Sequence, residues 1–163
     1  MKTLTLLRHA KAVPPGGLED HERPLSPRGH AAAAAVGKTT SPPALILCST
    51  SLRTRQTLAD LTEAWGTRPE VRFESLLYLA GPATLLRQVE ALPESVPSVW
   101  LIGHNPGLHE LALALLAGVL GADAFPELRN RFPTAGRATF EIDAVSWAGL
   151  GDARRVLSEF AYP

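Results

Sequence analysis

Residues Leu4–Ala12 read LTLLRHAKA, an apolar run that ends abruptly in an arginine, a histidine and a lysine. A short run that is apolar on both faces is typical of a strand inside a parallel sheet covered by helices on both sides. In open α/β sheets, ligands bind outside the carboxyl ends of the strands. The stretch therefore predicts a buried strand over Thr3–Leu7 and a functional position at Arg8 and His9.

Strand-like and helix-like segments alternate along the rest of the chain. Further apolar strand-like runs lie at 44–48, 71–73 and 99–102, and helical apolar spacing is found at 26–36, 49–65, 82–92 and 108–120. Two later strands, at 138–142 and 154–160, are joined by a turn near 149–151 and predict an antiparallel edge. Residues 121–137 are polar and without a clear pattern. The fold class expected is α/β, as a three-layer α/β/α sandwich with a mainly parallel central sheet.

Composition limits the kind of protein. With 163 residues, of which 45% are apolar, the chain can bury one sizeable core, so we expect a single domain over 1–163. The formal net charge of zero gives no global field toward nucleic acid or an acidic membrane surface. Cys48 is the only cysteine, which excludes an intramolecular disulfide and fits a reducing compartment. No apolar run approaches about 18 residues and no signal-peptide pattern opens the chain, so a cytoplasmic protein is expected, with its oligomeric state left open.

Polar residues follow three of the predicted strands directly. Arg8 and His9 come after the first, Arg53 lies in the opening turn of the helix after the second, and His104 follows the third. Because the carboxyl ends of parallel strands meet at one edge of a sheet, these side chains are expected to converge. Two helix N-termini add backbone N–H groups and positive dipole ends at the same edge. Such a site favours a dianion, and phosphate is the natural candidate.

Three motifs carry a family resemblance. Arg8-His9-Ala10, the segment 49–57 (STSLRTRQT) and Gly103-His104-Asn105-Pro106 together resemble the histidine phosphatase superfamily, branch 1, the phosphoglycerate-mutase-like group. The short chain and several smaller matches resemble the SixA-type phosphohistidine phosphatases within it; these matches are Arg-His-Ala at 8–10, Arg-Pro-Leu at 23–25 before Gly29, Leu-Tyr at 77–78 and Pro-Thr-Ala at 133–135. Thr50 and Leu58 depart from the family pattern at positions that carry no chemistry.

The resemblance implies a mechanism without metal or cofactor. His9 would be the nucleophile that accepts the phosphoryl group, which splits one difficult displacement into two easier ones. Arg8 and Arg53 would hold the equatorial oxygens, and His104, protonated in the complex, would donate another hydrogen bond. Asn105 and Arg23 are expected to contribute to substrate binding.

The proton donor to the leaving group stays open at this point. Many family members use a glutamate, and Glu74, just beyond the run 71–73, is the nearest match by position. Asp20 is the second candidate, because its loop follows the first strand and could fold over the pocket. A phosphoramidate has a leaving nitrogen that can already carry a proton, so a dedicated acid is dispensable for that substrate. Both carboxylates are equally well explained as solvated surface groups.

Other polar residues are assigned to structure or surface. His21, His30 and His109 are expected to be structural, and Arg55 to be exposed, because it lies two positions from Arg53 on a helix. Ser49 and Ser51 lack a nucleophile-elbow sequence and are expected to cap a helix; they are not predicted nucleophiles. A zinc site built from His104 and His109 is disfavoured by their spacing of five residues.

The sequence therefore predicts a hydrolase, a phosphatase working through phosphorylated His9. Its expected partner is a phosphate-bearing substrate, with phosphohistidine on another protein as the preferred class, because a chain this short leaves little material for a lid over the pocket. A phosphatase of small phosphorylated metabolites is the alternative. A mutase is less favoured, since retaining the phosphoryl group demands exclusion of water. A non-catalytic phosphate-binding relative is disfavoured by the presence of every core residue.

Overall fold

A six-stranded sheet forms the middle of the protein in the computed structural model, which describes residues 1–117, 119 and 122–163. The strand order is β3-β2-β4-β1-β5-β6. The strands are β1 (Lys2–Arg8), β2 (Leu45–Ser49), β3 (Glu70–Glu74), β4 (Ser98–Gly103), β5 (Arg137–Asp143) and β6 (Arg154–Ala161). The pairs β1·β4, β2·β4 and β2·β3 are parallel, whereas β5 and β6 run antiparallel at one edge, as the sequence predicts.

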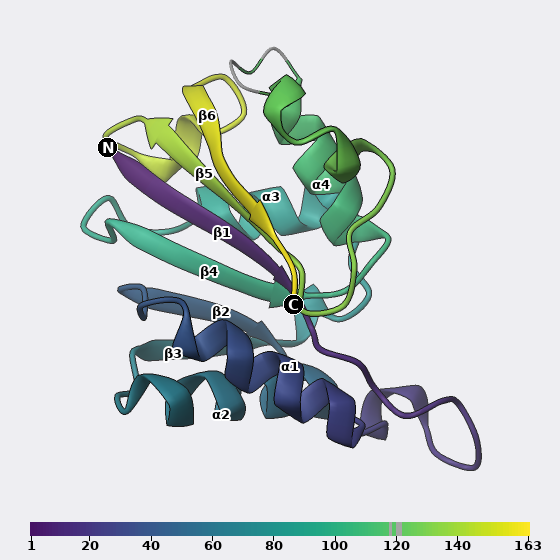
Figure 1. Ribbon diagram of the computed structural model, residues 1–163. Helices are drawn as coiled ribbons and strands as arrows, with labels where there is room; N and C mark the ends of the chain where they lie inside the picture. The colour runs from purple at the N-terminus through teal and green to yellow at the C-terminus, as the bar shows by residue number, and fades with distance from the viewer. Residues whose placement is uncertain (118, 120–121) are drawn as a thin grey trace.

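Helices cover both faces of this sheet (Figure 1). They are α1 (Pro27–Lys38), α2 (Leu52–Trp65), α3 (Pro82–Glu90) and α4 (Gly107–Leu116). Short 3-10 helices lie in the connections: η1 (Asp20–Glu22), η2 (Ser75–Leu77), η3 (Ala122–Ala124), η4 (Pro126–Arg129) and η5 (Trp147–Gly149). α1 and α2 pack together on one face and α3 and α4 on the other, which confirms the three-layer α/β/α architecture.

The opening strand is buried in the interior of the sheet, which confirms the buried strand expected from the sequence. β1 lies between β4 and β5, with Leu6 opposite both Leu101 and Ala138. Leu4 and Leu6 join the core under α3 and α4, whereas Leu7 joins the core under α1 and α2. All three leucines are fully buried. Complete burial of a leucine stabilises a fold by about 1.5–3 kcal/mol, so this strand anchors both layers.

Some boundaries differ from the sequence-based expectation. The helix expected over 49–65 begins only at Leu52, because Ser49 completes β2 and the Ser51 hydroxyl accepts a hydrogen bond from the Thr54 N–H as the helix cap. The helix expected over 108–120 spans Gly107–Leu116; residues 118 and 120 lie outside the described residues. The segment 121–137, which showed no pattern, contains two of the short 3-10 helices.

The parallel strands end at one edge of the sheet. In Figure 1 the arrowheads of β1, β4 and β2 point to the same end of the molecule, where the C-terminus also lies. α2 follows β2 and α4 follows β4, so both helices begin at this edge. Within the described ranges, no helix combines the length and apolar character needed to cross a bilayer.

Candidate active site

His9 lies immediately after β1 and is held by backbone on two sides. Its N–H donates to the Gly103 carbonyl (3.1 Å), and its own carbonyl accepts from the Ala135 N–H (3.1 Å). In the ring, Nδ1 lies 2.7 Å from the Ala10 carbonyl oxygen. A carbonyl can only accept, so Nδ1 carries the proton and Nε2 keeps its lone pair. The imidazole is thus oriented with a nucleophilic nitrogen directed away from its own backbone.

Arg53 and His104 meet this nitrogen. Arg53 is in the first turn of α2 and is buried, and its Nε donates to His9 Nε2 at 3.3 Å. One of its terminal nitrogens lies 3.4 Å from His104 Nδ1, and the two imidazole rings are 5.3 Å apart between centroids. The structure therefore brings together three of the residues that the sequence placed at separate strand ends.

Ser49 fixes the other side of His104. The Ser49 hydroxyl lies 2.7 Å from His104 Nε2, and both residues are buried. Because Arg53 can only donate to His104 Nδ1, the proton of the neutral ring is on Nε2 and is donated to Ser49. The sequence prediction of a helix cap at Ser49 is therefore wrong: the residue ends a strand. Its position directly at the end of an apolar run was a usable signal for a site residue.

Arg8 and Asn105 share one acceptor. The Arg8 guanidinium (2.9 Å) and the Asn105 amide nitrogen (3.0 Å) both donate to the Phe132 carbonyl. Arg8 Nε and Asn105 Oδ1 are buried and have no hydrogen-bond partner within the described part of the chain. Buried polar atoms without a partner are rare, and a donor of this kind at a strand end is available for a ligand oxygen.

The loop that contains Asp20 covers the outer edge of Arg53. The Arg53 guanidinium donates to the Asp20 carbonyl (2.7 Å) and to its carboxylate Oδ2 (3.0 Å). The Tyr78 hydroxyl donates to the same Oδ2, and Arg23 donates to Oδ1 (3.1 Å). Asp20 and Arg23 thus both lie at the mouth of the site, and Arg23 reaches it through Asp20.

The Tyr78 side chain lines the site, and the sequence analysis gave this residue no role. Its ring meets the His104 ring edge-on (5.4 Å between centroids, 86° between planes), and the Arg53 guanidinium lies 5.9 Å from its centroid. His21, expected to be structural, packs against the same tyrosine (4.8 Å between centroids) and bonds the Thr50 hydroxyl at 3.0 Å. The signal that could have pointed to Tyr78 was the Leu-Tyr pair at 77–78, one of the matches that resemble the SixA-type proteins.

Glu74 is placed differently from Asp20. It ends β3 opposite Ser49, and its carboxylate makes no hydrogen bond or ion pair with any described residue.

His30 lies 2.8 Å from the Asp60 carboxylate, and His109 bonds the Leu128 carbonyl, so both serve structure as expected. Arg55 is exposed, in agreement with its helical position.

Burial sets the protonation of the site. It lowers the pKa of His9 to about 4, and the nearby charge of Arg53 and Arg8 acts in the same direction. Burial likewise lowers the pKa of His104 to about 3, and the nearby His9 and Arg53 act in the same direction. In the free protein both imidazoles are therefore neutral at neutral pH. The protonated His104 expected from the sequence is therefore not the state of the free protein.

Asp20 is ionised. The hydrogen bond from Tyr78, followed by that from Arg53, lowers the pKa of the Asp20 carboxyl. Conversely, burial and the bond to Asp20 raise the pKa of Tyr78, so the phenol keeps its proton. These directions favour an ion-pairing role for Asp20 over proton donation. Cys48 is also unreactive, because burial raises the pKa of its thiol to about 12.

Comparison of the sequence with known proteins shows the family of this chain. The profile described as Histidine phosphatase superfamily (branch 1) matches residues 4–76. An uncharacterised protein of Mycobacterium tuberculosis (strain H37Rv) is 35% identical over 163 residues, which cover 96% of this chain and 99% of the relative. The chain belongs to the histidine phosphatase superfamily, branch 1.

Solved structures place this histidine phosphatase beside SixA-type proteins. A protein assigned as the phosphohistidine phosphatase SixA of Nakamurella multipartitia is 34% identical with a TM-score of 0.83, covering 99% of this chain and 96% of that one. A protein with the same assignment from Agrobacterium tumefaciens is 29% identical with a TM-score of 0.84, covering 99% and 98%. The histidine phosphatase described here is accordingly a hydrolase that acts on phosphoesters.

Proposed function

We propose that this phosphatase removes phosphoryl groups from phosphohistidine on other proteins, with His9 as the nucleophile. The observation that carries the proposal is the fixed tautomer of His9: Nδ1 is tied to the Ala10 carbonyl, and Nε2 is directed at the Arg53 guanidinium. A neutral, oriented imidazole beside a buried cation is suited to attack a phosphoryl dianion. The SixA assignment of similar structures supports the substrate class.

In the first step, the His9 Nε2 lone pair attacks phosphorus in line with the leaving nitrogen. The N–P bond to the substrate imidazole breaks as the new bond forms, and its electron pair returns to that imidazole. When the substrate ring already carries a proton on its other nitrogen, it leaves as neutral imidazole and no proton transfer is required. In phosphorylated His9, Nδ1 keeps its proton and donates it in a hydrogen bond to the Ala10 carbonyl.

In the second step, water attacks the phosphorus and the P–Nε2 bond breaks. The electron pair returns to His9, and the protons of water remain with inorganic phosphate and solvent. Arg8, through its unpartnered Nε, and Arg53 are the proposed ligands of the equatorial oxygens, with Asn105 beside Arg8. When the dianion binds and raises the pKa of His104, the ring takes up a proton from solvent on Nδ1 and donates a hydrogen bond from it to a phosphoryl oxygen, while Nε2 stays bonded to the Ser49 hydroxyl. Such preorganised donors contribute more in a buried site than in water.

Neither carboxylate is needed as an acid in this scheme. Asp20 is proposed to hold the outer edge of Arg53, so that the inner edge faces His9 and His104. Glu74 makes no hydrogen bond or ion pair with these groups and has no role in the proposed steps. A site without a required acid suits a leaving imidazole better than a leaving alkoxide, and this difference favours phosphohistidine over small phosphate esters.

Replacement of His9 tests the proposal. His9→Ala should lower turnover of phosphohistidine by at least a thousandfold, because the nucleophile is lost. Wild-type protein quenched during turnover should carry phosphate that is labile to acid and stable to alkali, and mass spectrometry should place it on His9. Arg55→Gln, an exposed change two positions from Arg53, serves as the matched control and should retain full activity.

Three results would contradict this proposal. Undiminished turnover by His9→Ala would remove the nucleophile from the mechanism. If the wild-type protein hydrolyses small phosphate esters much faster than phosphohistidine, its substrates are small phosphorylated metabolites and not phosphohistidine proteins. Turnover that disappears with a chelator would point to a metal-dependent reaction.

A further inference from the structure

Tyr78 contacts two of the side chains that the proposed function places around the phosphoryl group. Its ring meets the His104 ring edge-on with 5.4 Å between centroids, and the Arg53 guanidinium lies 5.9 Å from its centroid. Its hydroxyl donates to Asp20 Oδ2, and Arg53 donates to the same oxygen at 3.0 Å. Tyr78 thus acts on Arg53 through both its ring and its hydroxyl, and on His104 through its ring.

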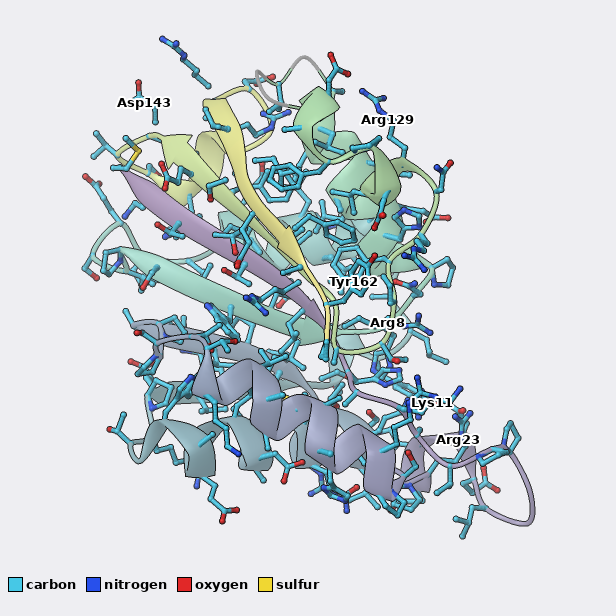
Figure 2. All side chains as sticks on the ribbon, viewed as in Figure 1. Arg8, Lys11, Arg23, Arg129, Asp143 and Tyr162 are labelled. Carbon is cyan, nitrogen blue, oxygen red and sulfur yellow. The ribbon has the colours of Figure 1, made fainter. Side chains whose placement is uncertain are left out.

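The Tyr78 hydroxyl helps to fix the Asp20 carboxylate, whose side chain is 45% exposed. An ion pair with an exposed partner contributes little by itself, since water and side-chain entropy compete with it. Asp20 Oδ1 accepts from Arg23 (3.1 Å), which belongs to the loop after β1, at the end of the molecule where Arg8 lies (Figure 2). Because Tyr78 lies 58 residues later than Asp20, its bond also ties this loop to the segment after β3.

The Tyr78 ring is restrained by His21. The two rings pack edge-on with 4.8 Å between centroids. His21 Nε2 lies 3.0 Å from the Thr50 hydroxyl, and Nδ1 lies 3.1 Å from the Glu22 carboxylate. With both nitrogens bonded, the imidazole has a defined orientation, and the edge-on contact transmits it to the tyrosine. The ring that meets His104 is therefore held by a second aromatic neighbour.

Backbone contacts fix the position of Tyr78 as well. The next residue, Leu79, has a φ of +50°, in the left-handed region that residues other than glycine rarely adopt. A Cβ on Gly107 would lie 1.8 Å from the Ala80 carbonyl oxygen, so the turn packs directly on the start of α4. Backbone strain that the surrounding structure holds in place gathers at functional positions. The placement of Tyr78 beside the site is therefore built into the backbone.

We propose that Tyr78 is a positioning residue for phosphoryl transfer, and this inference rests on the proposed function. Its hydroxyl orients Arg53 through the Asp20 carboxylate, and its ring keeps Arg53 and His104 aligned with each other. Tyr78 donates a hydrogen bond and gives up no proton in either step. The two contributions are separable, because phenylalanine keeps the ring and leucine keeps neither group.

A double-mutant cycle tests the action of the hydroxyl through Asp20. The variants are Tyr78→Phe, Asp20→Ala and the two combined, and calorimetry measures the dissociation constant of inorganic phosphate. Tyr78→Phe should weaken phosphate binding about threefold, since one hydrogen bond to the carboxylate is lost. In the Asp20→Ala background the same change should have no effect, because the hydroxyl has no acceptor left. The Asp20 backbone carbonyl, which accepts from Arg53 at 2.7 Å, is present in every variant.

Steady-state turnover of free phosphohistidine gives a second measurement. Tyr78→Phe should raise KM about threefold and change kcat less than about twofold, because Arg53 holds the phosphoryl oxygens in the substrate and in the transition state alike. A loss of folded protein would lower kcat and leave KM unchanged. Thermal unfolding of Tyr78→Phe should match that of the wild type, since the ring packing is kept.

Tyr78→Leu tests the ring. Phosphate binding should be weaker than in Tyr78→Phe by about a further threefold to tenfold, because the edge-on and cation–π contacts are lost. Equal phosphate affinities of the two variants would overturn the role of the ring.

Tyr162→Phe is the matched control. The Tyr162 hydroxyl donates to Glu127, which also accepts from Arg131 at 3.4 Å, and the Arg131 guanidinium lies 4.9 Å from the tyrosine centroid. The same three kinds of group thus meet there without Arg53 or His104. This variant should bind phosphate as the wild type does.

Three outcomes would overturn the role of the hydroxyl: an unchanged phosphate affinity in Tyr78→Phe, the same loss in both Asp20 backgrounds, or an equal loss in Tyr162→Phe. Phosphate affinity is measured without turnover. A wild-type protein that binds phosphate but does not hydrolyse phosphohistidine would therefore overturn the proposed function, while the cycle would still decide the role of Tyr78.

Discussion

Asp20 shows how one side chain takes its role from its partners. A carboxylate at the mouth of a phosphatase pocket is a natural candidate for the general acid. Here its Oδ2 accepts from both Arg53 and Tyr78, and these bonds lower its pKa. A carboxylate that is ionised and bonded to Arg53, the proposed phosphate ligand, positions that arginine and has no proton to donate.

Leaving-group dependence separates the two roles of Asp20. We expect Asp20→Asn to raise KM and lower kcat/KM by about fivefold to twentyfold, because Arg53 loses one charged hydrogen bond. The loss should be equal for para-nitrophenyl phosphate and phenyl phosphate, which differ in how much their leaving groups need a proton. Steady-state rates with both esters measure this. Glu19→Gln, one residue earlier and also exposed, is the control and should have no effect. A much greater loss with phenyl phosphate would assign Asp20 as the acid.

At the scale of elements, a close approach between two backbone segments sets the rim of the site. α4 begins at Gly107, and a Cβ there would meet the Ala80 carbonyl oxygen at 1.8 Å. The contact fixes the turn that carries Tyr78 and Leu79 against the helix that follows His104. The rim is therefore held by backbone contact as well as by side-chain bonds.

Gly107→Ala should disturb this contact. The added methyl group meets backbone that cannot rotate away, so the free energy of unfolding should fall by about 1–3 kcal/mol and activity should fall with it. Gly81→Ala is the control in the same turn, because a Cβ at Gly81 meets nothing within 4 Å. Thermal unfolding and turnover of free phosphohistidine measure both effects. Equal stability of the two variants would show that the turn adapts freely.

At the scale of the whole molecule, the site makes the fold sensitive to acid. Burial lowers the pKa of His9 to about 4 and that of His104 to about 3, below the ordinary value of 6.5. In the unfolded chain both imidazoles take up protons near pH 6.5, whereas in the folded protein they stay neutral. Above pH 6.5 the lowered pKa values therefore leave the free energy of unfolding unchanged. As the pH falls from 6.5 toward about 4, they decrease it progressively.

This linkage predicts a decline in stability over a defined window. Between pH 6.5 and about 4, the free energy of unfolding should decrease, with His9 alone contributing on the order of 3 kcal/mol. Urea titrations in buffers without phosphate measure the decline. His9→Asn should show a shallower decline than the wild type, because one buried imidazole is gone. Identical slopes for the two proteins would mean that His9 is not the source.

Local sequence patterns were sufficient for much of this protein. The apolar runs predicted each strand of the described residues, most strongly β1, β2 and β4, because a strand buried on both faces must be largely apolar. The serine and proline at 26–27 predicted the start of α1, where the Ser26 hydroxyl accepts from the Gly29 N–H. Because parallel strands end at a common edge, the residues after three of them predicted the meeting of His9, Arg53 and His104.

Contacts between distant segments decided the rest. The residues next to Ser49 in the sequence favour a helix cap, but its hydroxyl forms a hydrogen bond with His104, which lies 55 residues later in the chain. The roles of Asp20 and Tyr78 depend on a bond across 58 residues, and no periodicity encodes such a pairing. The lowered pKa values of His9 and His104 likewise arise from burial, which the surrounding layers create. Strand and helix follow from the local apolar pattern, whereas the protonation and partners of a polar side chain follow from what the folded chain places around it.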